Sequence, residues 1–186
     1  MVWIIILVII VLIALYIAAA YNGLVSLKQR VNNAWSQIDV QLQRRFDLIP
    51  NLVDTVKGYM AHEAGTLEKV TELRTSWANA KTTDEKIDIS NQLSGTLKTI
   101  MAVSESYPDL KANQSFLSLQ ADLKDTEEKV AFSRQFYNDT VTMFNTRIET
   151  FPTNIIANMF KFTSATLFAV DSEEAKKAVK VDFNQK

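Results

Sequence analysis

The chain opens with an apolar stretch that is long enough to cross a membrane. Residues 2–21 contain no charged side chain and are rich in Ile, Leu, Val and Ala. A helix of this length spans about 30 Å, which is the thickness of the hydrocarbon core of a bilayer. Although Ala18, Ala19 and Ala20 resemble a cleavage site, no Lys or Arg precedes the stretch, and it is longer than the apolar core of about 7–15 residues in a signal peptide. The pattern therefore predicts an uncleaved transmembrane anchor over residues 1–21 and a water-soluble domain over residues 22–186.

Beyond the anchor, apolar side chains recur every three or four positions, which is the pattern of amphipathic helices. The first stripe comprises Val31, Trp35, Ile38, Leu42, Phe46, Ile49, Val53, Val56 and Met60. Pro50 interrupts this stripe, and because proline cannot donate a backbone hydrogen bond, we expect a kink or break near residues 46–49. Asp47 is placed to cap a restarted helix with Pro50 in its first turn. Asn22 and Gly23, directly after the anchor, form a turn-like pair that predicts a flexible joint.

Local end signals divide the next part of the chain into two helices. Apolar positions from residue 67 to residue 77 have the helical period and predict a helix to about residue 80. Thr82 and Glu85 have the spacing of a capping box, so a second helix is expected to begin there. The pair Tyr107-Pro108 ends this second helix, because the residue before a proline avoids the helical conformation.

The last long stripe predicts a helix from near Leu110 to Phe151-Pro152, followed by a short apolar helix over residues 154–160. For the tail, residues 163–186, the pattern leaves open whether its apolar side chains pack on the bundle or add an edge element. These side chains are Phe168, Val170, Val181 and Phe183. Long paired stripes favour helices that lie side by side. The predicted fold is therefore all-α, with an N-terminal transmembrane helix followed by an antiparallel up-and-down bundle of long helices.

Charge and composition narrow the possible partners and the orientation. The 20 basic and 21 acidic residues all follow the apolar stretch and are interspersed, so the net charge is only −1. No basic run marks a nucleic-acid-binding surface, and no nucleic-acid partner is expected. Lys28 and Arg30 lie just after the anchor, and the positive-inside rule therefore places the N-terminus outside and the water-soluble domain in the cytoplasm. The absence of cysteine excludes structural disulfides and a lipid-modified cysteine.

Few residues have the chemistry that catalysis requires. His62 is the only histidine, and although His62-Glu63 resembles the start of a zinc-protease motif, residue 66 is Thr where the second histidine would stand. The adjacent carboxylates Glu127-Glu128 and Glu173-Glu174 point about 100° apart on a helix and do not converge. No glycine-rich phosphate loop or nucleophile elbow is present. The sequence therefore predicts that the protein is not an enzyme and has no metal, no cofactor and no small-molecule substrate.

Polar side chains accompany the first apolar stripe. They are Asn33, Gln37, Asp39, Gln41, Arg44, Arg45 and Asp47. The simpler interpretation is a solvated helix face. The alternative is a polar network that fixes the register between helices or subunits, with the candidate residues Asp39, Gln41, Arg44, Arg45 and Asp47. Trp35 and Trp77 lie on apolar stripes and are expected to anchor the core.

Two blocks of sequence resemble the LemA family. The first begins at Tyr21-Asn22-Gly23 and continues through Ile38-Asp39-Val40-Gln41-Leu42 to Asp47-Leu48-Ile49-Pro50-Asn51-Leu52-Val53. The second is Tyr107-Pro108-Asp109-Leu110-Lys111-Ala112-Asn113-Gln114, and the tail Val179-Lys180-Val181-Asp182-Phe183 also matches. The resemblance implies a single-pass inner-membrane protein with an antiparallel helical bundle and, in at least part of the family, an outward N-terminus. The biochemical function of the family is poorly defined, but its members are often encoded beside membrane zinc metalloproteases, which implies a scaffold or adaptor role.

These features predict a non-enzymatic membrane scaffold or adaptor. Its expected partners are the lipid bilayer, through residues 2–21, and either further copies of the chain in a homo-oligomer or another membrane protein, such as a membrane metalloprotease. The alternative function is that of an envelope-remodelling or lipid-contacting protein, in which Phe160, Phe162 and Phe168 touch a membrane.

Overall fold

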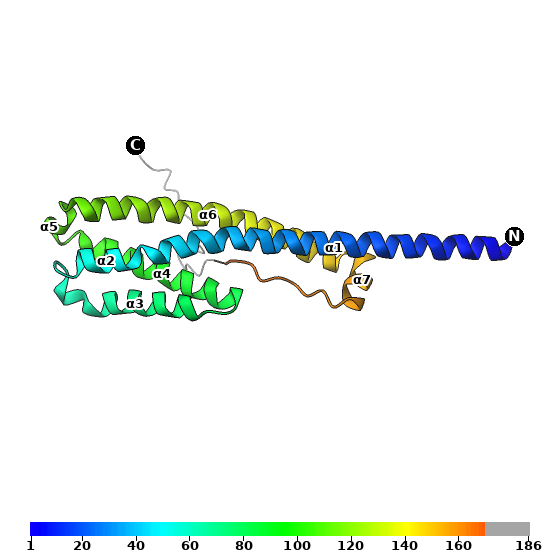
Figure 1. Cartoon of the computed structure of the whole chain (residues 1–186), viewed down its shortest axis with the longest axis horizontal. Coiled ribbons are helices and arrows are strands. Elements are labelled where there is room, and N and C mark those ends of the chain that lie inside the picture. Colours follow the sequence, from blue (N-terminus) through cyan, green and yellow to red (C-terminus); the bar gives the residue numbers. More distant parts are fainter. Residues whose placement is uncertain (170–186) are drawn as a thin grey trace, which may run out of the picture.

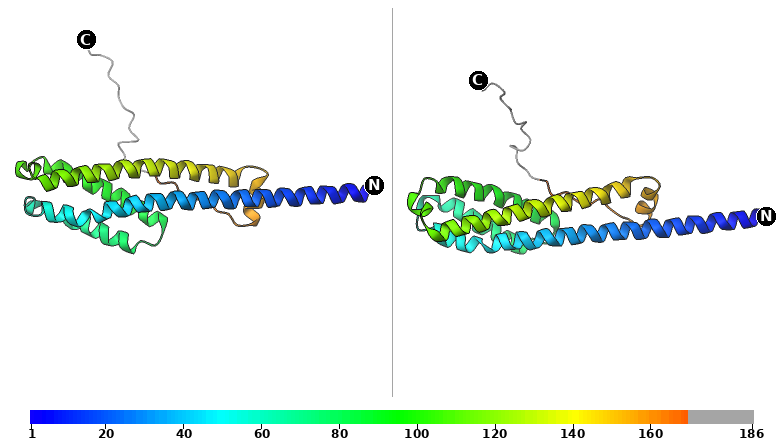
Figure 2. Two further views of the ribbon diagram at one scale, coloured as in Figure 1. Left: turned by 45° about the horizontal axis from the view of Figure 1, so that its top comes forward. Right: turned by 90° about the horizontal axis from the view of Figure 1, so that it is seen from above.

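One helix runs through both the apolar stretch and the polar part that follows it. In the computed structural model, which describes residues 1–169, α1 extends without interruption from Val2 to Asp47, a length of 46 residues or about 69 Å. The helix α6 (Gln114–Glu149) packs beside α1 in the opposite direction, and together they form the spine of an elongated rod (Figure 1). The N-terminal part of α1 projects alone beyond the end of α6 (Figure 2).

The flexible joint expected at Asn22 and Gly23 is wrong, because both residues lie within α1. Ala20 and Leu24, on either side of the pair, are buried in the core and hold this part of the helix in place. A glycine inside a helix costs roughly 0.5–1 kcal/mol relative to alanine. Packing on both sides outweighs a local penalty of this size.

The break expected before Pro50 is confirmed. α1 ends at Asp47, and α2 (Ile49–Val56) begins after Leu48 with Pro50 in its first turn. The expected cap by Asp47 is wrong, because its carboxylate instead accepts a hydrogen bond from Gln43 at 2.8 Å. The physical reason is that Leu48 keeps helical dihedral angles (φ −78°, ψ −17°), whereas a capping residue is extended. The interruption is thus too short to contain a capping turn.

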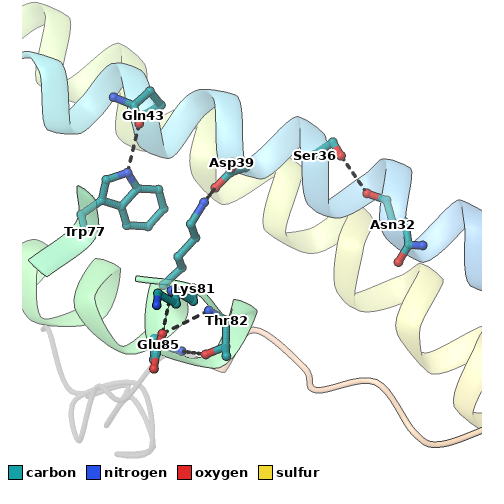
Figure 3. Close-up of polar contacts among 9 residues, drawn as sticks. Asn32, Ser36, Asp39, Gln43, Trp77, Lys81, Thr82 and Glu85 are labelled. Atoms are coloured by element: carbon teal, nitrogen blue, oxygen red, sulfur yellow. Dashed lines mark hydrogen bonds and ion pairs between the residues drawn. The ribbon is translucent and has the colours of Figure 1, made fainter. Parts of the chain in front are cut away.

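The two helices predicted after residue 60 form a hairpin. A short turn of 3-10 helix, η1 (Ala61–Glu63), leads into α3 (Ala64–Asn79), and α4 (Thr83–Ser104) returns alongside α3. The capping box is confirmed, since the Thr82 hydroxyl accepts from the backbone N–H of Glu85 and the Glu85 carboxylate accepts from the backbone N–H of Thr82 (Figure 3).

The last long helix begins later than residue 110. Pro108 opens a single-turn helix, α5 (Pro108–Lys111), and α6 starts at Gln114. The Asn113 side chain caps α6 by accepting from the backbone N–H groups of Ser115 and Phe116. Pro108 therefore begins the short helix α5, and the capping Asn113 begins the long helix α6.

The predicted all-α antiparallel bundle is confirmed, and no strand occurs within residues 1–169. At the end of the rod far from the N-terminus, α1 and α2 pack with α3, α4 and α6 around a shared apolar core (Figures 1 and 2). The ring of Phe46 stacks on that of buried Trp77 with centroids 4.5 Å apart. Trp35 is half-buried and packs edge-on against Tyr137 at 5.6 Å.

The short apolar helix predicted after the proline is also confirmed, as α7 (Thr153–Met159). Residues 163–169 then run back along the rod in an extended conformation (Figure 1). This answers the question about the tail for its first part: Phe168 is buried in the core. The predictions for Val170, Glu173-Glu174, Val181 and Phe183 lie outside the described residues.

Two asparagines of α6 hold this extended segment as a neighbouring strand would. The Asn145 side chain donates to the carbonyl of Ala165 and accepts from its N–H, both at 2.9 Å. Asn138 does the same for Phe168, at 3.1 and 2.8 Å. The two asparagines are two helical turns apart, about 10.5 Å, and three extended residues cover about 10 Å, so the spacings match.

Candidate functional site

No group of three His, Asp or Glu side chains within residues 1–169 is placed to hold a metal ion. His62 lies exposed in η1. The polar side chains of α1 and the exposed apolar side chains of the rod are therefore the features to consider as sites of interaction.

Arg45 is the centre of the polar contacts between helices. Its Nη1 donates to the Ser94 hydroxyl of α4 at 2.9 Å, and its Nη2 lies 2.7 Å from the Glu127 carboxylate of α6. The Arg45 side chain is only 4% exposed, whereas that of Glu127 is 49% exposed. One guanidinium thus joins three helices.

Burial is the main electrostatic influence on Arg45. Loss of hydration lowers the pKa of its guanidinium, and the nearby Glu127 carboxylate opposes this effect. Because arginine titrates far above neutral pH, the side chain stays charged. Its buried Nε has no hydrogen-bond partner, so Glu127 and Ser94 supply all of its polar contacts within the described residues. A buried charge with so few partners depends strongly on each of them.

Two further contacts tie α1 to the α3–α4 hairpin. The Asp39 carboxylate lies 2.5 Å from the Lys86 ammonium of α4, and the Gln43 carbonyl oxygen accepts from the Trp77 indole N–H of α3 at 3.1 Å (Figure 3). The Lys86 ammonium also lies 4.9 Å from the centroid of the Trp77 ring. These side chains therefore form polar contacts between α1 and the hairpin.

The other candidate residues of α1 do not make such contacts. Asp47 bonds only to Gln43 within its own helix. Arg44 is exposed, and its positive charge adds a small part to the lowering of the Asp125 pKa, which is caused mainly by a hydrogen bond from Lys129. Gln41 lies at a shallow groove between α1 and α6, where its Oε1 is buried without a hydrogen-bond partner among residues 1–169.

Within the described residues, Asp39 and Arg45 are therefore the two of the five candidates that form ion pairs or hydrogen bonds with other helices. Their role in fixing register stays a prediction. The partners Lys86, Ser94 and Glu127 were not identified from the sequence, because helix period locates a side chain on its own helix and not opposite a residue of another. Gln43 was missed because it belongs to the same polar face as its neighbours and nothing local distinguishes it.

An exposed apolar row runs along α6. Phe132, Phe136 and Met143 are 76%, 51% and 55% exposed. Because they are four and seven positions apart, they lie on one face of the helix, away from the buried stripe. We call these three residues the α6 row. Large aromatic side chains and methionine are enriched in protein interfaces.

The aromatic residues expected to touch lipid in the alternative function are arranged differently. Phe168 is 2% exposed and is a core residue, so it is not available to a membrane. Phe162 is half-buried against Phe144, with ring centroids 6.4 Å apart. Phe160 alone of the three keeps a large exposed fraction, 46%.

Comparison with known proteins supplies the family. Residues 34–183 match the LemA family over most of the chain, including all of α2 to α7. The chain belongs to the LemA family. From residue 34 onward, the match covers both sequence blocks that resemble the family. It also includes Asp39, Arg45 and the α6 row.

Similar proteins come from two bacteria. The LemA protein of Metamycoplasma hominis is 27% identical over 154 residues, covering 82% of this chain and 70% of that protein. The magnetosome proteins MamQ 1 and MamQ 2 of Paramagnetospirillum magneticum are each 23% identical over 174 residues, covering 80% of this chain. The match spans 64% of the length of each magnetosome protein, just under two thirds.

In this member of the LemA family, α1 is long and apolar enough to cross a membrane. The most apolar part of the helix, near the N-terminus, has a mean hydropathy of 3.3. None of this part is buried inside the protein. Side chains from Val2 to Tyr16 are exposed, although almost all of them are apolar. A helix buried in a protein core would be covered, so the exposure of this part fits a lipid environment.

Proposed function

We propose that this chain is a non-enzymatic scaffold or adaptor of the inner membrane. In this proposal residues 1–21 anchor the protein in the bilayer, and the domain of residues 22–186 binds a second copy of the chain or another membrane protein, such as a membrane metalloprotease. The N-terminus lies outside and the domain lies in the cytoplasm, as the positions of Lys28 and Arg30 favour.

The α6 row is the observation that carries this proposal. Exposing three large apolar side chains on one face of a helix to water is unfavourable in free energy unless another surface covers them. The row lies on α6, and α6 packs along α1, the helix that contains the apolar stretch. A partner bound at the row would therefore be held at a fixed distance from the anchor. A rod with an exposed apolar face suits a binding role.

The test is the mass of the full-length protein extracted in mild detergent, with any co-purifying chains identified. We expect a defined assembly, either a homo-oligomer or a complex with a second membrane protein. Changing Phe132 and Phe136 together to Ser should dissociate it, because both apolar contacts are lost. The matched control is Leu117→Ser, an exposed apolar residue of the same helix about 22 Å from Phe132, which should leave the assembly intact.

A monomer without companions would overturn the scaffold proposal and favour the alternative, a protein that acts on the envelope through lipid contact. Loss of the assembly in the Leu117→Ser control as well would show that the α6 row is not its site. Orientation is tested separately. The chain has no cysteine, so a Leu117→Cys variant carries a unique, exposed thiol outside the α6 row, which a membrane-impermeant reagent should not label in intact cells if the domain is cytoplasmic.

A further inference from the structure

The helix α7 packs where the apolar part of α1 ends. The ring of Tyr21 lies 4.6 Å from that of Phe160, which directly follows α7. Ala20 is 5% exposed and Ile17 is partly buried, whereas the side chains from Val2 to Tyr16 are exposed. Figures 1 and 2 show α7 at the end of the rod from which α1 continues alone. This end therefore lies at the level where residues 2–21 would leave the hydrocarbon core.

The segment that contains α7 carries no charge and exposes several apolar side chains. The sequence has no charged residue between Glu149 and Lys161. Four apolar side chains in this interval are exposed, and we call them the α7 cap: Phe151 (75%), Ile155 (60%), Met159 (57%) and Phe160 (46%). The opposite side of α7 is fixed to the bundle, since Ile156 and Ala157 are buried. The cap is thus held rigidly and faces away from the core.

Basic residues flank the cap in the sequence and on the neighbouring part of α1. Lys28, Arg30, Arg147 and Lys161 are all exposed near this end of the rod, and Glu149 is the acidic residue among them. The Lys28 ammonium lies 5.9 Å from the centroid of the Phe162 ring, on the segment that follows the cap. Lys28 is seven residues beyond Tyr21, about 10 Å along α1. At that depth a basic side chain can reach the phosphate groups of anionic lipids.

We propose that the α7 cap inserts into the interfacial layer of the bilayer beside α1, as a second membrane contact. Apolar side chains flanked by basic ones are the composition that binds an anionic lipid surface. The bilayer is the occupant because α1 itself brings lipid to this level, so the cap needs no further partner to be covered. The contact holds this end of the rod at the membrane surface, and it does not depend on the scaffold function.

The experiment measures the depth of single labelled positions in the full-length chain, reconstituted in vesicles of phosphatidylcholine and phosphatidylglycerol. Because the chain has no cysteine, the variants Ile155→Cys and Met159→Cys can each carry one bimane fluorophore. Leu117→Cys, also apolar and exposed but at the start of α6 and outside the α6 row, is the matched control. We expect nitroxide-labelled lipid to remove most of the bimane fluorescence at 155 and 159, and iodide in the water to do so only at 117.

Quenching by nitroxide lipid at 155 and 159 that is no stronger than at 117 would overturn the proposal. Protection from iodide without lipid quenching, increasing with the protein-to-lipid ratio, would also overturn it, because a second copy would then cover the cap. In phosphatidylcholine alone, lipid quenching at 155 should weaken, and an unchanged value would refute the part assigned to the basic side chains. Should Ile155→Cys fail to fold, Asn158→Cys places the probe at an exposed polar position of the same helix.

Discussion

Arg45 and Glu127 form an ion pair whose two partners differ greatly in exposure, and this difference predicts unequal effects of removing each one. In Glu127→Gln the buried guanidinium loses its counter-charge and keeps Ser94 as its remaining strong partner. Removing one partner of a buried pair costs up to about 3–5 kcal/mol, and a hydrogen bond to a charged group contributes about 1.5–3 kcal/mol. Since a glutamine oxygen can still accept a weaker bond, we expect a loss of about 2–3 kcal/mol in the free energy of unfolding.

The converse change, Arg45→Met, should cost much less. The half-exposed Glu127 carboxylate becomes hydrated when its partner is removed, and the Ser94 hydroxyl already donates to the carbonyl of Ser90 at 3.1 Å. Methionine fills much of the space of the arginine stem. Replacing a buried charge by an apolar side chain of similar volume is often neutral or stabilising, so we expect a change within about 1 kcal/mol of zero.

The assay is urea unfolding of the full-length chain in mild detergent, followed by far-ultraviolet circular dichroism. Glu128→Gln, at the adjacent exposed position, is the control for loss of one negative charge. The double variant Arg45→Met with Glu127→Gln should be about as stable as Arg45→Met alone, because the unpaired buried charge is gone. The reasoning is refuted if Arg45→Met is the more damaging single change, or if Glu127→Gln costs no more than Glu128→Gln.

Three further predictions concern the extended segment, the course of α1 and the capping box. Asn145→Ala removes both hydrogen bonds to Ala165 and should destabilise the extended segment by about 1–2 kcal/mol. The amide hydrogen of Ala165 should then exchange faster with solvent. The control Asn32→Ala, at an exposed position of α1, should leave this exchange rate unchanged. Gly23→Ala should raise the free energy of unfolding by about 0.5–1 kcal/mol, because the added Cβ meets nothing within 4 Å; a loss of stability would argue that this glycine is needed for bending. Backbone hydrogen bonds from Lys81 and Thr82 hold the pKa of Glu85 below its usual range, so the stabilisation by the capping box is present above about pH 4.3 and is lost as the pH falls through the lower, folded-state value. Glu85→Gln should remove this part of the acid dependence, and a carboxyl titration followed by NMR that gives a normal midpoint for Glu85 would contradict it.

The features that could be predicted from the sequence are those determined by neighbouring residues. Thr82 and Glu85 form their capping box within one helical turn, and the break before Pro50 follows from the missing N–H of proline. Asp47 failed as a cap because the break is a single residue long, a length that residue preferences do not specify. Gly23 failed as a joint because its flanking residues are packed, and burial is a property of the fold.

The contacts of Arg45 could not be predicted because they depend on how far three helices slide past one another. The sequence places Arg45 on the border of the apolar stripe of α1. It does not show that Ser94 of α4 and Glu127 of α6 lie opposite Arg45 in the folded bundle. The asparagines of α6 present a related difficulty: Asn138 and Asn145 look like ordinary polar residues until an extended segment lies beside them. Their spacing of two helical turns is a signal that becomes informative only when paired with an extended partner.

Because α1 has no hinge, any tilt of its N-terminal apolar part is transmitted to the rest of the rod. From Tyr21 to Asp47 the helix extends about 39 Å, and transmembrane helices tilt by about 20° on average. A straight arm of that length and tilt carries its far end about 13 Å sideways from the point where it leaves the membrane. Since tilt responds to bilayer thickness, a thicker or thinner membrane would swing the far end of the rod through an arc. In the proposed membrane arrangement, a small change in bilayer thickness would therefore produce a displacement, several times larger, at the far end of the rod.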